Sequence, residues 1–157
     1  MAKQYEHWCD KGRNKESIFE TELIAEKLQM ELEQYILHDI APNNEDPVKM
    51  RFVYDKMSSI LRKAENITAT VKDANSVQAI YAIDYINRRD KWLNAKGMCY
   101  QITVLLKNVS LILKEGVNLE KYCRISYAYE KKLAPKIKGV MVSDDKRRKK
   151  QCKKYSG

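Results

Sequence analysis

Apolar side chains between residues 53 and 71 recur at alternating steps of four and three, and this spacing restricts the fold more than any other feature. The six residues are Val53, Met57, Ile60, Ala64, Ile67 and Val71. Such steps average about one helical turn, so the six side chains share one side of an α-helix, as in a bundle seam. Asp46 and Pro47 precede the pattern as an acidic N-cap and a proline at the first helical position. The sequence therefore predicts a helix from residue 47 whose apolar side other helices must cover.

Three further segments show the helical period, at about residues 17–38, 76–113 and 118–137. Residues 72–75 are predicted to connect the second helix to the third, and Gly97 marks a candidate bend. Pro135 is predicted to kink the fourth helix or end it early, and Gly139 to stop it. No segment alternates with the period of a strand. The prediction is an all-α, up-down four-helix bundle over residues 17–142, with an N-terminal tail (1–16) and a disordered basic C-terminal tail (143–157).

Length and composition favour one domain in a reducing compartment. The chain has 157 residues, and no stretch approaches the 18 consecutive apolar residues of a membrane-spanning helix. The first residues lack the apolar core of a secretory signal. The four cysteines match no zinc or redox spacing, so Cys99 and Cys123 are expected to act as small hydrophobes. We therefore expect a cytoplasmic protein with reduced thiols and no membrane partner.

Groups that carry out acid–base or nucleophilic chemistry are scarce. The two histidines are His7, in the predicted N-terminal tail, and His38, at the end of the first helix. Neither is preceded by the arginine that helical-bundle RNases place four to six residues before their histidine. A phosphate-binding Gly-rich loop, HExxH and Glu-x-x-His are all absent from the sequence. We therefore predict a protein that is not an enzyme and holds no metal or cofactor.

Positive charge is concentrated at the C-terminus. Seven of the 30 basic residues lie between Lys146 and Lys154, where none of the 21 acidic residues occurs, so this segment carries +7 of the formal net charge of +9. A cationic strip of this kind attracts polyanions by releasing their condensed counterions. The pattern indicates a protein that binds nucleic acid.

The predicted helices differ in charge. The first carries five glutamates and one lysine, net −4, whereas the third is net +3 and the fourth, counted over residues 118–138, is net +4. Lys121, Arg124, Lys131 and Lys138 fall at offsets of 0, 3, 10 and 17, which places them on one side of an uninterrupted helix. The predicted nucleic-acid interface is therefore the basic side of helices three and four, continued by the tail. An ordinary solvated bundle exterior is the alternative explanation.

Several short motifs between Ile80 and Lys146 carry a family resemblance. They are Arg88-Arg89, residues 95–99 (AKGMC), residues 117–122 (VNLEKY), Glu130-Lys131, Ile137-Lys138-Gly139 and residues 143–146 (SDDK). In these motifs the chain resembles the accessory variability determinant (Avd) proteins of diversity-generating retroelements, which are four-helix bundle proteins. The match covers less than half of the chain.

The resemblance implies a basic bundle that assembles into a ring, typically a homopentamer. It implies template RNA and a reverse transcriptase as partners, and a role in the mutagenic cDNA synthesis that diversifies a target gene. It assigns nucleic-acid contacts to Arg88, Arg89, Lys121, Lys131, Lys138 and Lys146. The charge pattern adds Lys91, Lys96, Arg124, Lys132, Lys136, Arg147, Arg148, Lys149 and Lys150.

Three functions remain open from the sequence. The first is a non-catalytic RNA-binding accessory subunit of a reverse transcriptase, which would act by electrostatic scaffolding. The second is a stand-alone RNA- or ribosome-associated bundle. The third is a protein–protein adaptor that binds no nucleic acid.

Overall fold

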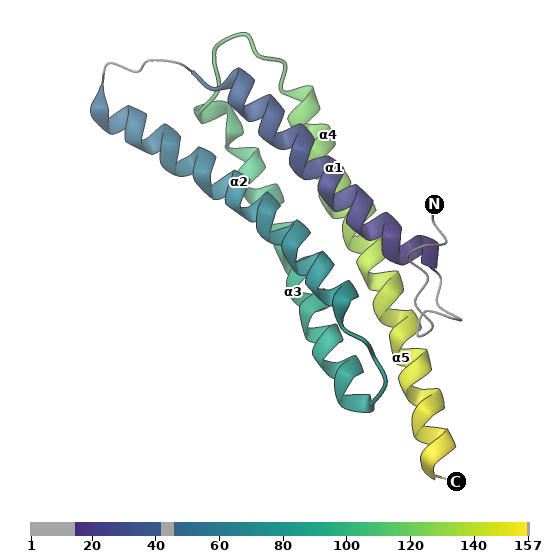
Figure 1. Cartoon of the computed structure of the whole chain (residues 1–157). Helices are drawn as coiled ribbons and strands as arrows, with labels where there is room; N and C mark the ends of the chain where they lie inside the picture. Colours follow the sequence, from purple (N-terminus) through teal and green to yellow (C-terminus); the bar gives the residue numbers. More distant parts are fainter. Residues whose placement is uncertain (1–14, 42–45, 157) are drawn as a thin grey trace.

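Long antiparallel helices form the whole of the described structure (Figure 1). The computed structural model describes residues 15–41 and 46–156, and the side chains of residues 20–41 and 46–152. The helices are α1 (Lys15–Asp39), α2 (Pro47–Ser76), α3 (Ala82–Lys107), α4 (Glu120–Ala128) and α5 (Ala134–Ser156). A π-helix, η4 (Tyr129–Leu133), joins α4 to α5 without a break, and a 3₁₀ turn, η3 (Val109–Leu111), follows α3. Within these residues there is no β-strand, so the predicted all-α bundle is confirmed.

The beginnings of α2 and α3 follow from local capping. Asp46 is the N-cap of α2, and its side chain accepts a hydrogen bond of 3.0 Å from the backbone N–H of Val48, as predicted. At α3, Asp84 accepts a backbone hydrogen bond from Tyr81, which helps to satisfy N–H groups that have no partner inside the helix. Helix α2 continues to Ser76, so the predicted connection at residues 72–75 is wrong, and the chain turns at residues 77–81 instead. Gly97 lies inside an unbroken α3.

The predicted disordered tail is not confirmed, because α5 continues through residue 143 to Ser156. Gly139 does not stop this helix, and Pro135 does not end it. Proline cannot donate the hydrogen bond that continues an α-helical ladder. The chain accommodates Pro135 with the π-turn directly before it, where the N–H of Ala134 donates to the carbonyl of Tyr129. Asp144, in the predicted tail, is buried against the bundle. The predicted boundary between bundle and tail at residue 142 is therefore corrected.

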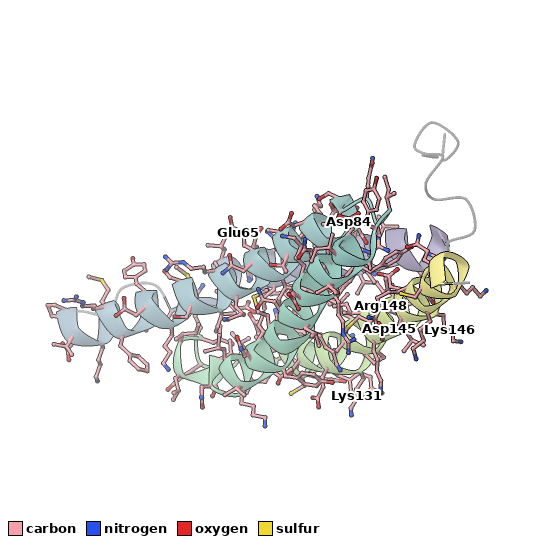
Figure 2. The ribbon with its side chains drawn as sticks, turned by 90° about the horizontal axis from the view of Figure 1, so that it is seen from below. Glu65, Asp84, Lys131, Asp145, Lys146 and Arg148 are labelled. Atoms are coloured by element: carbon pink, nitrogen blue, oxygen red, sulfur yellow. The ribbon has the colours of Figure 1, made fainter. Side chains whose placement is uncertain are left out.

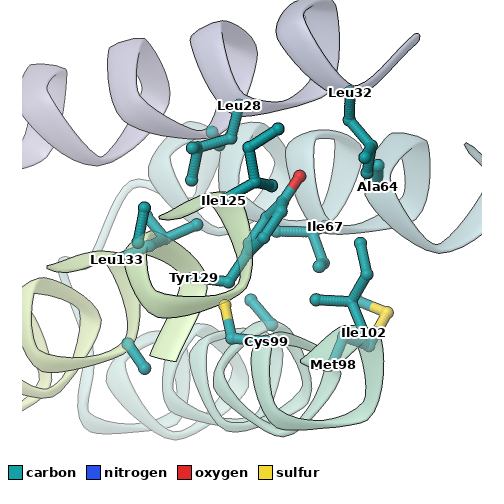
Figure 3. Close-up of a cluster of buried hydrophobic side chains, with 14 of the residues drawn as sticks. Leu28, Leu32, Ala64, Ile67, Met98, Cys99, Ile102, Ile125, Tyr129 and Leu133 are labelled. Carbon is teal, nitrogen blue, oxygen red and sulfur yellow. The ribbon is translucent and has the colours of Figure 1, made fainter. Parts of the chain in front are cut away.

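The core is formed where α1, α2, α3 and the α4–α5 rod face one another. Figure 3 shows Tyr129 projecting among Leu28, Ile67, Ile102 and other buried side chains from every one of these helices. Burial raises the pKa of the Tyr129 hydroxyl, which has no hydrogen-bond partner among the described residues. Cys99 is buried as predicted, with its thiol pKa raised by burial to about 12, whereas Cys123 is exposed and the prediction for it was wrong.

The first half of α2 contacts this core along one side only. Between Asp46 and Ser59 no side chain is buried, and Val48, Phe52 and Tyr54 are exposed. The first buried side chain of the helix is Ile60. The predicted seam is therefore in contact along its length: Val53 and Met57 are partly buried and pack against the core, and the other four residues are buried in it. None of the helices among the described residues offers an apolar stretch of the length that a bilayer crossing requires.

Candidate nucleic-acid interface

The fifteen basic residues predicted to bind nucleic acid fall into three groups. Arg88 is buried, with 2% of its surface exposed. Six have a carboxylate within ion-pair distance: Arg89, Lys91, Lys121, Lys131, Lys136 and Arg147. Within the part of the chain that the structure describes, the remaining eight have no such partner: Lys96, Arg124, Lys132, Lys138, Lys146, Arg148, Lys149 and Lys150. The predicted interface therefore contains cations with different structural roles.

Arg88 joins α3 to α5 and is not available to a phosphate. Its Nε donates to Asp144 at 2.7 Å and its Nη2 donates to the other carboxylate oxygen at 2.6 Å, which gives a two-pronged ion pair. Its Nη1 donates to the carbonyl of Val77 at 3.1 Å. The guanidinium also lies 5.3 Å from the ring centroid of Tyr85. The assignment of Arg88 to the interface is therefore corrected, because burial and four contacts leave the guanidinium no free edge for a ligand.

Arg89 repeats this pairing at the surface, where its Nη1 lies 3.5 Å from Asp145. Two motifs that carry the family resemblance, Arg88-Arg89 and residues 143–146, thus meet in space as two neighbouring ion pairs. They connect the start of α3 to the middle of α5. No pattern in the sequence indicates this contact, since the paired residues are 56 positions apart.

Lys121 belongs to a second buried polar cluster at the opposite end of the bundle. Asp39 accepts hydrogen bonds from Tyr122 at 2.6 Å and Lys121 at 2.5 Å, and it lies 2.9 Å from His38. Burial raises the pKa of the Asp39 carboxyl, but the hydrogen bonds from His38, Lys121 and Tyr122 outweigh it and hold the pKa well below its ordinary value. The Asp39 backbone carbonyl accepts from the N–H of Lys114, so this cluster joins α1 to the α3–α4 connection.

The π-turn changes which side of the last helix each lysine occupies. An extra residue in one turn rotates the helix after it by about 100° relative to an uninterrupted α-helix. Lys138 therefore does not continue the side of Lys121 and Arg124, although the offsets in the sequence predict that it does. Asp39 in addition holds Lys121. The predicted four-residue basic line is corrected to two separate basic surfaces.

The first surface is the basic face of α5, made of Lys138, Lys146, Lys149 and Lys150. Their offsets of 0, 8, 11 and 12 place them within about 120° of one another around the helix, opposite the buried Ile137, Val140 and Asp144. All four are exposed. In Figure 2, Lys131 and Lys146 lie on the side of the α4–α5 rod, whereas Glu65 and Asp84 lie on the side of α2 and α3.

The second surface is a groove of about 340 Å³ between α1 and α4. Lys27, Lys121, Arg124 and Lys132 line it together with one acid, Glu31. Lys121 Nζ lies 4.6 Å from the ring centroid of Tyr35, which is also part of the lining. Sequence reasoning placed three of these cations in the interface but missed Lys27, because α1 was read as an acidic helix.

The acidic side chains of α1 are largely used within the chain. Glu20 pairs with Lys136 at 2.7 Å, Glu26 pairs with Lys72, and Glu22 accepts from Asn75 at 2.9 Å. The net charge of −4 counted for this segment is therefore partly neutralised by α2 and α5.

A third feature was missed by the sequence reading: α3 is apolar on two opposite sides. Ile83, Ile86, Leu93, Tyr100 and Val104 are all exposed, from 44% for Ile86 and Tyr100 to 59% for Val104. Their offsets of 0, 3, 10, 17 and 21 are those of a heptad seam, and Asp90 and Gly97 occupy its two other positions. We call these five residues the outer stripe of α3. The heptad spacing of these five residues is present in the sequence. The prediction for this helix rests instead on the apolar pattern of its inward side, around Trp92, Cys99 and Ile102.

Comparisons with known proteins give no independent identification: no family model, no curated protein and no solved structure matches the chain.

Proposed function

We propose that this protein is a non-catalytic, RNA-binding accessory subunit of a diversity-generating retroelement reverse transcriptase, and that it works as a homo-oligomer. The observation that carries RNA binding is the basic face of α5, where Lys138, Lys146, Lys149 and Lys150 have no carboxylate partner among the described residues. The link to a reverse transcriptase is supported by the resemblance of the motifs between Ile80 and Lys146.

The mechanism is electrostatic. Each phosphate that a lysine neutralises releases condensed counterions, so affinity rises without base recognition. A helix binds RNA at a lower entropy cost than a flexible tail, because its lysines already point to the same side before RNA binds. The Arg88–Asp144 ion pair holds the helix to the bundle between Lys138 and Lys146, within the length of the basic face.

Self-association is supported by the outer stripe of α3 and by the exposed Val48, Phe52 and Tyr54 of α2. Exposed apolar residues at heptad spacing are those that a helix buries against a partner helix. Gly97 lies in the middle of the stripe, and apart from its own stretch of helix no atom of the described residues comes within 4 Å of the position that a Cβ would occupy, so another backbone can approach there. A ring would repeat the basic face several-fold and bind RNA by avidity.

The RNA part of the proposal is tested by neutralising the basic face. The variant K138Q/K146Q/K149Q/K150Q is expected to lower affinity for single-stranded RNA about a hundredfold at low salt, and to reduce the slope of log Kd against log salt by about 3. Fluorescence anisotropy over a salt titration measures both quantities.

The matched control neutralises four cations that have carboxylate partners, in K72Q/R89Q/K91Q/K136Q. It removes the same formal charge as the α5-face variant. The two variants therefore differ in where on the surface the positive charge is lost. An equal loss of affinity in the two variants would contradict an interface on the α5 face. Affinity that does not change with salt would contradict the electrostatic mechanism.

The oligomer is tested by placing charge in the outer stripe. L93E/V104E is expected to convert the assembly to monomers, because a carboxylate buried in an apolar helix contact is strongly unfavourable. Light scattering after size exclusion measures the mass, and an exposed polar site outside the stripe, N94E, is the control. A wild-type protein that is already monomeric at micromolar concentration would end this part of the proposal.

The polymerase part is tested by reconstitution. The protein should co-purify with a retroelement reverse transcriptase and increase cDNA synthesis on its template RNA. If RNA is retained without a polymerase, the stand-alone RNA-associated bundle is the better explanation. If the outer stripe binds a protein and the chain binds no RNA, a protein–protein adaptor is the better explanation.

A further inference from the structure

The groove between α1 and α4 has an apolar floor beneath a cationic rim. Ile24 and Leu28 from α1 and Ile125 and Ala128 from α4 form the floor. Leu28, Ile125 and Ala128 are also core residues, so the floor is held rigidly by the packing beneath it. The volume of about 340 Å³ is within the range of small-ligand pockets.

The rim carries a net positive charge that the chain does not neutralise. Of its four cations, Lys121 is held by Asp39 and by the faces of Tyr35 and Tyr122. For Lys27, Arg124 and Lys132, no carboxylate lies within ion-pair distance in the described part of the chain. Glu31 is the one acid in the lining. Three unpaired cations above an apolar floor are suited to a ligand with an anionic group and a flat apolar body.

The π-turn contributes to this arrangement. Arg124, Ala128 and Lys132 follow one another at intervals of four residues, and in an α-helix such a row drifts around the axis. A π-turn takes more residues per turn and therefore turns Lys132 back toward the row that Arg124 begins. The same turn accommodates Pro135, so one local irregularity both keeps the rod continuous and places Lys132 at the groove.

We propose that this groove binds one unpaired nucleotide of an RNA strand, with its phosphate on Lys27, Arg124 and Lys132 and its base on the apolar floor beside Tyr35. This inference rests on the proposed RNA-binding function and adds a site that distinguishes unpaired from paired RNA. Stacking on apolar and aromatic groups is the usual way in which proteins hold a splayed base. Glu31 supplies an acceptor for a base N–H donor. The acidic side chains of a peptide carry no flat ring that could lie on the floor beside Tyr35.

The test compares short single-stranded RNA, duplex RNA and an abasic ribose-phosphate oligomer by fluorescence anisotropy on the full chain. The wild type is expected to prefer single-stranded RNA over the other two by about tenfold, the scale of one stacked base. K27Q/R124Q/K132Q is expected to lose this preference. The equal-charge control R62Q/K107Q/K114Q, at exposed sites on α2, α3 and the α3–α4 connection, is expected to keep it.

A second variant, Ile24→Trp, fills the groove and leaves every charge in place. It should lose the preference for single strands while duplex binding stays at the wild-type level. Circular dichroism and thermal melting establish that the variants are folded, and the triple variant changes only side chains at the rim, so it remains a valid test if Ile24→Trp does not fold.

The outcomes separate the two proposals. If the wild type binds no RNA at all, the proposed function is wrong and this inference falls with it. If the α5-face variant lowers RNA affinity but both groove variants keep the wild-type preference for single strands, RNA binding stands and the groove site is wrong. A glutamate-rich peptide that displaces single-stranded RNA from the groove more effectively than a nucleotide does would also overturn it.

Discussion

The two sides of α5 use charge in opposite ways. Asp144 and Lys146 are two residues apart, yet Asp144 is buried and bonded to Arg88, while Lys146 is exposed and no carboxylate in the described part of the chain pairs with it. On the inward side, opposite charges hold the bundle together. On the outward side, like charges accumulate and are balanced only by solvent ions. The contrast shows that net charge in a segment measures neither its stability nor its capacity to bind phosphate.

Two neighbouring arginines of α3 also lie on the inside and the outside, but both are paired. Arg88 is inside and Arg89 is outside, and each has its acid on α5. The two pairs differ mainly in how much water surrounds them, because 48% of the Arg89 side chain is exposed against 2% of that of Arg88. Desolvation makes the loss of one member of a buried pair far more costly than the loss of a surface pair.

The largest effect is expected from breaking the inner pair alone. Arg88→Met leaves Asp144 buried with its main partner gone, and should lower the free energy of unfolding by about 3–5 kcal/mol. Urea denaturation measures this change. Arg89→Met is the surface control, and it should cost less than about 1 kcal/mol.

The double variant R88M/D144L sharpens the comparison further. Replacing both members with apolar side chains removes the unpaired charge, so stability should return to within about 2 kcal/mol of the wild type. A double variant as unstable as Arg88→Met would mean that the pair acts through its geometry and not through the cost of an isolated charge.

A smaller effect is expected at the other end of the bundle. Asp39→Asn replaces a charged acceptor of hydrogen bonds from Lys121 and Tyr122, and should lower stability by about 2 kcal/mol at pH 7. The measurement is again urea denaturation.

The pH dependence of this effect has a definite sign. Because the pKa of Asp39 is lowered on folding, its contribution is present above the ordinary carboxyl pKa and is lost as the pH falls through the lower value in the folded protein. The stability difference between wild type and Asp39→Asn should therefore shrink as the pH is lowered below about 4. A difference that stays constant down to pH 2 would show that the charge of Asp39 does not stabilise the fold.

Much of the fold could be predicted because helical periodicity is local. The seam from Val53 to Val71 and the cap at Asp46 depend on residues within a few turns of one another, and both helix type and start were predicted from them. The helical state of residues 143–156 was not predicted. There Asp144 meets Arg88 across the bundle, a contact that composition does not reveal, and composition alone favours an unfolded strip when lysines and arginines are so dense.

The candidate site was predicted only in part. The density of cations at the C-terminus was visible in the sequence, and the basic face of α5 comes from it. The groove was not foreseen, since it needs Lys27 from one helix and Arg124 from another, and since Lys132 reaches it through a π-turn that the sequence signals only by Pro135.

The amino-acid sequence by itself determined that this chain is helical, rich in positive charge toward its end, and apolar along both sides of α3, because these properties repeat within one or two turns. Tertiary structure alone decided which cations are buried, which are paired and which remain available to a phosphate. The physical reason is that an ion pair depends on distance and dehydration, and both are set by helices that lie far apart in the chain and meet only when it folds.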